Sequence, residues 1–200
     1  NNRAEFNVAG IEIENTTNAD VYDNVATKNT GGILVFNMPQ IPKEGHSSRV
    51  FRNTIVSNNT ENFAAAGTAV SGVPKGSGVL INSNDRVEIF NNQFKDNQTA
   101  NILISSYFSA NFAGQRELAD EFDPYPEEIF IYDNDFVGGG TEPGRDYLIQ
   151  LKNQVFGESG NFPDIIWDGM TNPVDQGRQV ICIQNAAAQI FNLDLPNEFK

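Results

Sequence analysis

The sequence is poor in cysteine, basic residues and long apolar runs, and each shortage excludes a class of protein. The single cysteine, Cys182, excludes an intrachain disulfide, and its apolar neighbours (VICIQ) predict a small core residue. No segment reaches the about 18 consecutive apolar residues of a membrane-spanning helix, so we expect no transmembrane segment in this chain. The net charge is −13, which excludes nucleic acid as an expected partner because a phosphate backbone would be repelled.

Signatures of common catalytic sites are also missing. The chain has no Ser-His-Asp set, no phosphate-binding glycine loop and no Cys-x-x-Cys pair, and His46 is its only histidine. His46 lies in a loop-like segment, PKEGHSS, where it is either a surface residue or a weak candidate for a catalytic group. A lone histidine cannot form a metal site by itself.

Two short sequence units alternate along the chain instead. The first is an apolar strand-like run that usually begins with glycine, and the second ends in an aromatic residue, a polar residue and asparagine. The first unit occurs at 10–13, 32–35, 78–81 and 101–104, and the second at 21–24, 50–53, 89–92 and 131–134. Residues 78–97 form the most regular copy, with a third short strand around Phe94. This alternation predicts one repeated supersecondary element.

Three short strands in a repeat of about 22 residues are typical of a right-handed parallel β-helix, so we expect an all-β solenoid. Apolar residues at period two, such as Ile33 and Val35, would point inward and stack in columns about 4.8 Å apart. The recurring asparagines would stack at one corner and hydrogen-bond from coil to coil. This ladder is predicted to contain Asn24, Asn53, Asn92 and Asn134. Arg52 is expected beside Asp23 of the neighbouring coil.

We expect a single domain over residues 1–200, with regular coils over 1–136 and irregular final coils and a cap over 137–200. Proline-containing insertions at 37–47, 60–77 and 105–127 interrupt the repeat and are predicted to be loops that leave the coil at a corner. No cap-like segment precedes the first coil, which suggests a piece of a longer chain. In solenoids such loops often form the binding face.

The acidic segment ELADEFDPYPEE, residues 117–128, has three interpretations. Its carboxylates at Asp120 and Asp123 could hold Ca²⁺, although the spacing of an EF-hand is absent. Asp120 and Asp123 could instead act with Tyr125 as acid and base on a sugar. The third interpretation is a solvated acidic loop. If the loop binds a ligand, we expect Asp120, Asp123, Tyr125 and Glu127 to contact it, with no cofactor other than Ca²⁺.

The combination of GIEIENT, NTGGILVFNMP, NNTENFA, GSGVLINSND, ISSYF, DPYPEEIFIY and PDIIWDG resembles bacterial parallel β-helix repeat-containing proteins of the exported, often lipoprotein-type kind. The resemblance implies export to the periplasm, the outer membrane or the extracellular space, and an exported partner protein. More distantly, the architecture is similar to polysaccharide lyases, pectinases and mannuronan C5-epimerases. The epimerase motif Asp-Pro-His-Asp has its nearest counterpart at 123–126, where Tyr125 replaces histidine and Pro126 replaces the second aspartate.

Three functions follow as hypotheses. The first is a non-catalytic module that binds a carbohydrate or a protein through its loops. The second is a polysaccharide lyase, hydrolase or C5-epimerase that uses the 117–128 loop. The third is a structural stack within a larger assembly. The negative net charge disfavours a polyuronate as ligand or substrate.

Overall fold

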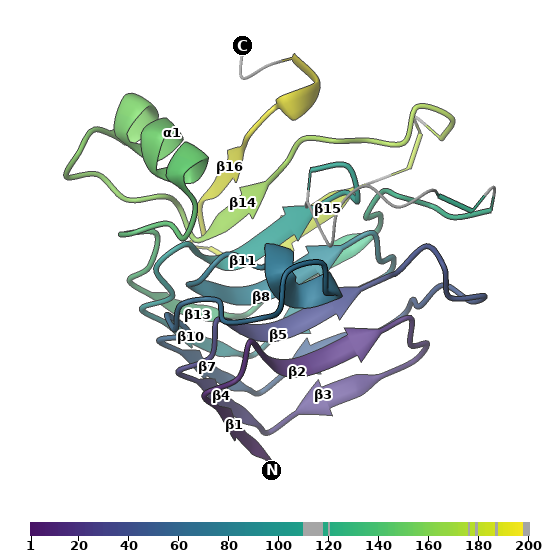
Figure 1. The fold of residues 1–200 in the computed structure, drawn as a ribbon, viewed down its shortest axis with the longest axis horizontal. Helices are drawn as coiled ribbons and strands as arrows, with labels where there is room; N and C mark the ends of the chain where they lie inside the picture. Colours follow the sequence, from purple (N-terminus) through teal and green to yellow (C-terminus); the bar gives the residue numbers. More distant parts are fainter. Residues whose placement is uncertain (110–117, 120, 176, 179, 187, 198–200) are drawn as a thin grey trace.

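The computed structural model describes residues 1–109, 118–119, 121–175, 177–178, 180–186 and 188–197. Its strands form three parallel sheets that run along the solenoid, and successive coils stack upward from the N-terminus (Figure 1). Sheet 1 contains β1 (Arg3–Glu5), β4 (Val25–Thr27), β7 (Thr54–Val56), β10 (Gln93–Lys95) and β13 (Asp135–Val137). Sheet 2 contains β2 (Ala9–Glu14), β5 (Gly31–Phe36), β8 (Ser77–Asn82), β11 (Ala100–Ser105), β14 (Ile165–Trp167) and β16 (Ile190–Asn192). Sheet 3 contains β3 (Asp20–Tyr22), β6 (Arg49–Phe51), β9 (Glu88–Phe90), β12 (Ile129–Tyr132) and β15 (Ile181–Gln184).

Each coil takes one strand from each sheet in turn, so the predicted right-handed parallel β-helix is confirmed. Strands pair only with their equivalents one coil away, because a three-strand coil has no sequence neighbour with which to form a hairpin. The parallel register places Ile33 beside Val79, and Val79 beside Ile102, in sheet 2. These side chains are fully buried and form part of one continuous core inside the coils. Parallel strands continue beyond residue 136 as β13, β14, β15 and β16.

The predicted asparagine ladder is confirmed along the corner between sheets 3 and 1. The Nδ2 of Asn24 donates to Oδ1 of Asn53 at 3.0 Å, and Asn53 donates to Asn92 at the same distance. Asn92 in turn donates to Asn134 at 3.0 Å. The backbone N–H of each donor residue also binds the same Oδ1, so each amide satisfies polar groups of two coils.

A second ladder, which the sequence analysis missed, follows sheet 1 at the corner that leads into sheet 2. It links Asn29, Asn58 and Asn97 by amide hydrogen bonds of 3.0–3.1 Å. The ladder explains the glycines that begin the sheet 2 strands. A Cβ on Gly32 would lie 2.9 Å from Nδ2 of Asn58 and 2.5 Å from the carbonyl oxygen of Gly78. Only glycine fits where backbone and amide approach this closely.

The corners also need left-handed backbone, and several residues other than asparagine and glycine adopt it. At the corner after sheet 1, Phe6, Lys28, Ser57 and Asp96 have φ angles of 62°, 55°, 50° and 52°. At the asparagine corner, the residue in the left-handed region is the one before each ladder asparagine, for example Arg52. Arg52 contacts Asp23 through two hydrogen bonds of 2.8 and 2.9 Å, so this expected pairing is confirmed.

The outer face of sheet 2 carries a second hydrophobic cluster. Leu34, Leu80 and Leu103 point away from the coil interior and are nevertheless buried. The helix α1 (Asp146–Phe156) contributes Leu148 and Leu151 to this cluster, and η1 (Ala69–Gly72) packs against it. The part of the chain expected to form irregular final coils and a cap thus contains a helix that covers this face. Among the described residues, no helix is long and apolar enough to cross a membrane.

The three insertions lie at two different corners. The segments after β5 and β11 both leave the end of a sheet 2 strand and lead into sheet 3, and so does the segment after β14. These loops project together on the right of Figure 1. The segment after β7 instead leads from sheet 1 into sheet 2 and carries η1, and the segment with α1 leaves the same corner. Only the insertions at 37–47 and 105–127 therefore share a side.

Candidate functional site

A group of three carboxylates lies where the loops at the corner between sheets 2 and 3 converge. Oxygen atoms of Asp85, Asp123 and Glu127 all lie within 4.8 Å of one another. Asp85 comes from the short corner between β8 and β9, whereas Asp123 and Glu127 come from the insertion between β11 and β12. The backbone N–H of Glu127 donates to Oδ1 of Asp85 at 3.1 Å and fixes the two segments together.

Arg178, from the loop after β14, is the basic residue of this group. Its guanidinium binds the carboxylate of Glu127 and lies 3.6 Å from a carboxylate oxygen of Asp85. It also lies 3.6 Å from Glu128 and 4.0 Å from Asp175. One arginine thus lies within 4.0 Å of four carboxylates, so the negative charge around Arg178 is only partly neutralised.

Glu44 connects this group to the other insertion on the same side. Its Oε1 accepts a hydrogen bond of 2.6 Å from the backbone N–H of Asp123. Oδ2 of Asp123 lies 3.5 Å from the amide nitrogen of Asn172, in the loop after β14. The loops that follow β5, β11 and β14 are thus tied together around Asp123.

Burial and like charge shift the protonation of these carboxyl groups. Burial, followed by the charge of Asp123, raises the pKa of Asp85 to about 7. Burial is also the largest cause that raises the pKa of Glu127, although its bond to Arg178 opposes the shift. The Glu127 side chain is only 1% exposed, whereas that of Asp85 is 20% exposed. Asp85 and Asp123 are therefore the carboxylates of this group that a ligand can reach.

The structure brings most of the predicted site residues to one place. Asp123, Tyr125 and Glu127 lie in the carboxylate group or beside it, and the Tyr125 backbone N–H donates to Oδ1 of Asp123 at 3.0 Å. Burial, and then the charges of Asp123 and Asp168, raise the pKa of the Tyr125 hydroxyl. His46 forms parallel bridges with Thr17 and Asp85, so it lies one coil below Asp85 in the same corner column. The Nδ1 of His46 lies 3.0 Å from Oγ of Ser47.

One predicted residue, Asp120, lies outside the described residues. The sequence analysis missed Asp85, Arg178 and Glu44, which come from three other segments. The sequence held one signal for Asp85, because this carboxylate ends the polar corner Asn82-Ser83-Asn84-Asp85 that immediately follows the strand unit. No local pattern marked Arg178, since Glu127, the carboxylate that it contacts most closely, lies 51 residues earlier in the chain.

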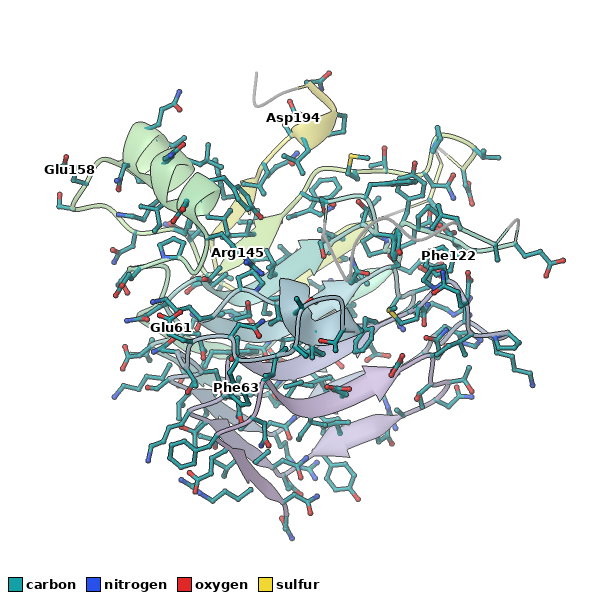
Figure 2. The ribbon with its side chains drawn as sticks, in the orientation of Figure 1. Glu61, Phe63, Phe122, Arg145, Glu158 and Asp194 are labelled. Carbon is teal, nitrogen blue, oxygen red and sulfur yellow. The ribbon has the colours of Figure 1, made fainter. Side chains whose placement is uncertain are left out.

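A cleft of about 940 Å³ lies beside the carboxylate group, between the two insertions. Apolar side chains form its walls: Pro39, Ile41 and Pro42 from one loop, and Leu118, Ala119 and Phe122 from the other. The carboxylates of Glu44 and Glu121 also line it. Figure 2 shows Phe122 on the side of the molecule where these loops project. The cleft therefore offers a ligand both apolar and polar surface, and polar groups in such a site can fix a ligand's orientation.

Calcium fits this arrangement only in part. Ca²⁺ takes six to eight oxygen ligands, and the group supplies three carboxylates, one of which is bound to Arg178. Calcium at Asp123 stays a prediction, and no step below depends on it.

A second exposed feature, a stack of aromatic rings on the outer face of sheet 3, is a weaker candidate for sugar binding. Tyr22, Phe51, Phe90 and Tyr132 stack with ring centroids 4.8–5.1 Å apart and interplanar angles of 3–14°. Their ring faces therefore contact one another, and a sugar would meet ring edges. Arg52 covers the stack further, with its guanidinium 4.9 Å from the Phe51 ring centroid.

No protein-family model, curated protein or solved structure matches this chain. The family resemblance of its motifs and the location that it implies therefore stay predictions, and function is inferred from the geometry of the site.

Proposed function

We propose that this protein is a non-catalytic binding module of the bacterial cell envelope that holds a glycan in the cleft between the insertions at 37–47 and 105–127. The observation that carries the proposal is the cleft itself, which combines apolar walls with carboxylates at its edge. The C–H faces of a sugar ring suit walls such as Pro42 and Phe122, while its hydroxyl groups can donate to Glu44 and Glu121.

The charge around the cleft restricts the glycan to one without net negative charge. Glu44 accepts a hydrogen bond from Asp123 of the carboxylate group, and Arg178, the arginine that contacts this group among the described residues, is bound to Glu127. A polyuronate would place further carboxylates against this group and would be repelled.

A glycan array followed by isothermal titration calorimetry tests this proposal. The wild-type protein is expected to bind neutral or amine-bearing oligosaccharides and not to bind oligogalacturonates. Phe122→Ala is expected to weaken binding about tenfold or more, because it removes an aromatic wall of the cleft. Phe63→Ala is the matched control, since Phe63 is 62% exposed on the other insertion (Figure 2). Equal losses in both variants, or no glycan ligand at all, would contradict the proposal.

Hydrolysis of a glycan is the second candidate, and the raised pKa of Asp85 is the observation that favours it. A carboxyl group with a pKa of about 7 beside an accessible carboxylate, Asp123, is the combination that glycosidases use as acid and base. A lyase or C5-epimerase is less well supported, because those enzymes must neutralise a uronate and Arg178 is already paired. Turnover of neutral glycans by the wild type, and loss of this turnover in Asp123→Asn, would establish hydrolysis. A wild-type protein without turnover would exclude hydrolysis.

Export and an exported partner protein are proposed from the resemblance of the motifs alone. Fractionation of the source bacterium with an antibody against this chain tests the location. Recovery in the cytoplasm would contradict it.

A further inference from the structure

The cleft between the two insertions has a marked imbalance of charge. Glu44 and Glu121 line it, and none of its described lining residues is basic. Its remaining described lining consists of prolines, aliphatic residues, Phe122 and Gln40. A ligand that fills this cleft therefore meets apolar walls and carboxylates together.

Glu44 is held in place for contact with a ligand. Its Oε1 is occupied by the backbone N–H of Asp123 at 2.6 Å, and the side chain is half-buried. Burial raises the pKa of Glu44, and the charge of Asp123 adds to the shift, while the backbone hydrogen bond opposes it. A positive group bound at Glu44 would offset this cost of ionisation, because an opposite charge favours the ionised carboxyl.

The surroundings offer little competing positive charge. In the described part of the chain, the arginine that contacts the carboxylate group is Arg178, and it is paired with Glu127 and lies 3.6 Å from Glu128. Lys43 precedes Glu44 but does not line the cleft. The described residues therefore give the cleft a negative electrostatic potential, which a recess of low polarity strengthens.

We propose that the cleft selects a glycan that carries protonated amines, of the deacetylated hexosamine class, over neutral and anionic glycans. This inference rests on the proposed function and names the ligand class of the same site. The sugar rings pack on Pro39, Pro42 and Phe122, and their ammonium groups bind Glu44 and Glu121. An ammonium group donates up to three hydrogen bonds and is attracted to the face of an aromatic ring, so Phe122 also contributes to recognition of charge.

Calorimetry with three hexasaccharides of equal length tests the inference on the intact protein. The ligands are a β-1,4-glucosamine hexamer, its N-acetylated counterpart and a galacturonic acid hexamer. The glucosamine hexamer is expected to bind about tenfold or more tightly than the N-acetylated one, and its affinity should fall as salt rises. The galacturonic acid hexamer is expected not to bind.

Charge-neutralising variants identify the residues responsible. Glu44→Gln keeps an oxygen that can accept the Asp123 N–H, so the loops stay joined while the charge is lost. Glu44→Gln and Glu121→Gln are each expected to weaken glucosamine binding about tenfold and to leave binding of the N-acetylated hexamer unchanged. Glu158→Gln is the matched control, because Glu158 is exposed beyond α1, on the other side of the view in Figure 2.

The outcomes separate the inference from the proposed function. Equal affinity for the two hexosamine ligands would overturn the selection for amines and leave glycan binding standing. No binding of either would overturn both. An oligolysine peptide that binds as tightly as the glucosamine hexamer, with the same loss in Glu44→Gln, would also overturn the inference, since the cleft would then recognise polycations of any kind.

Discussion

Replacement of Asn53 by alanine is expected to destabilise the solenoid more than its small change in volume suggests. The Asn53 side chain is buried and lies in the middle of the ladder between sheets 3 and 1. Its Oδ1 accepts hydrogen bonds from both the backbone N–H and Nδ2 of Asn24, each at 3.0 Å. Its Nδ2 donates to Oδ1 of Asn92 and to the carbonyl oxygen of Val21.

The magnitude follows from the polar groups that alanine would leave without partners. Two donors of Asn24 lose their acceptor, and the Val21 carbonyl loses its donor, whereas Oδ1 of Asn92 keeps the backbone N–H of residue 53. A buried polar group without a partner costs about 1–3 kcal/mol, and partial access of water at the corner reduces the sum. We expect Asn53→Ala to lower the free energy of unfolding by about 4 kcal/mol.

Urea unfolding followed by far-ultraviolet circular dichroism measures this loss. Asn153→Ala is the matched control, because Asn153 is exposed on α1 and alanine has the higher helix propensity. The control is expected to change the free energy of unfolding by less than about 1 kcal/mol. A loss below about 1 kcal/mol for Asn53→Ala would refute the reasoning, since the ladder would then contribute no more than exposed hydrogen bonds.

Three further predictions concern the glycine column, the carboxylate group and the left-handed corners. Gly32→Ala is expected to lower stability by about 3 kcal/mol in urea titrations, because its Cβ would lie 2.5 Å from the Gly78 carbonyl oxygen, whereas Gly177→Ala, with no atom nearby, should change little. Asp85 has a pKa of about 7 in the folded protein and about 4 when unfolded, so the folded state binds its proton more tightly and stability falls as pH rises through this window. Asp85→Asn should remove this loss, so that its free energy of unfolding at pH 8 is about 2 kcal/mol above that of the wild type in thermal or urea unfolding. If the wild type instead becomes more stable than the variant as pH rises over this range, the pKa assigned to Asp85 is wrong. Lys28 has a φ of 55°, so Lys28→Val should be about 1 kcal/mol less stable than Lys28→Asn, and equal stability would show that the corner relaxes.

The fold was readable from the sequence because its determinants recur at matching positions. Period-two apolar residues such as Ile33 and Val35 need a partner coil to bury them, and the repeated corner asparagines specify the register of the stack. The second ladder was harder to find. Asn29, Asn58 and Asn97 lack the repeated aromatic residue that precedes the first ladder, and only the stacked coils show that they align.

The burial of the outer face of sheet 2 could not be predicted from the sequence, because the contacts that cover this face follow no local pattern. Leu34 and Leu80 alternate with the inward residues, so these strands are apolar on both faces, as in parallel sheets that are covered on both sides. They are covered by η1, which lies in the insertion just before β8, and by α1, which comes from a segment much later in the chain.

The candidate site, like the fold, could be predicted from the sequence only in part. From the residues alone it could be predicted that this chain forms coils, that loops interrupt them, and that Asp123, Tyr125 and Glu127 belong to an acidic loop. The stacking of the coils was needed to show that two of the three insertions share a corner, and that Asp85 and Arg178 join the acidic loop there. The physical reason is that a solenoid brings together residues one coil apart, and the length of each insertion, rather than any local preference, sets how far apart those residues lie in the sequence.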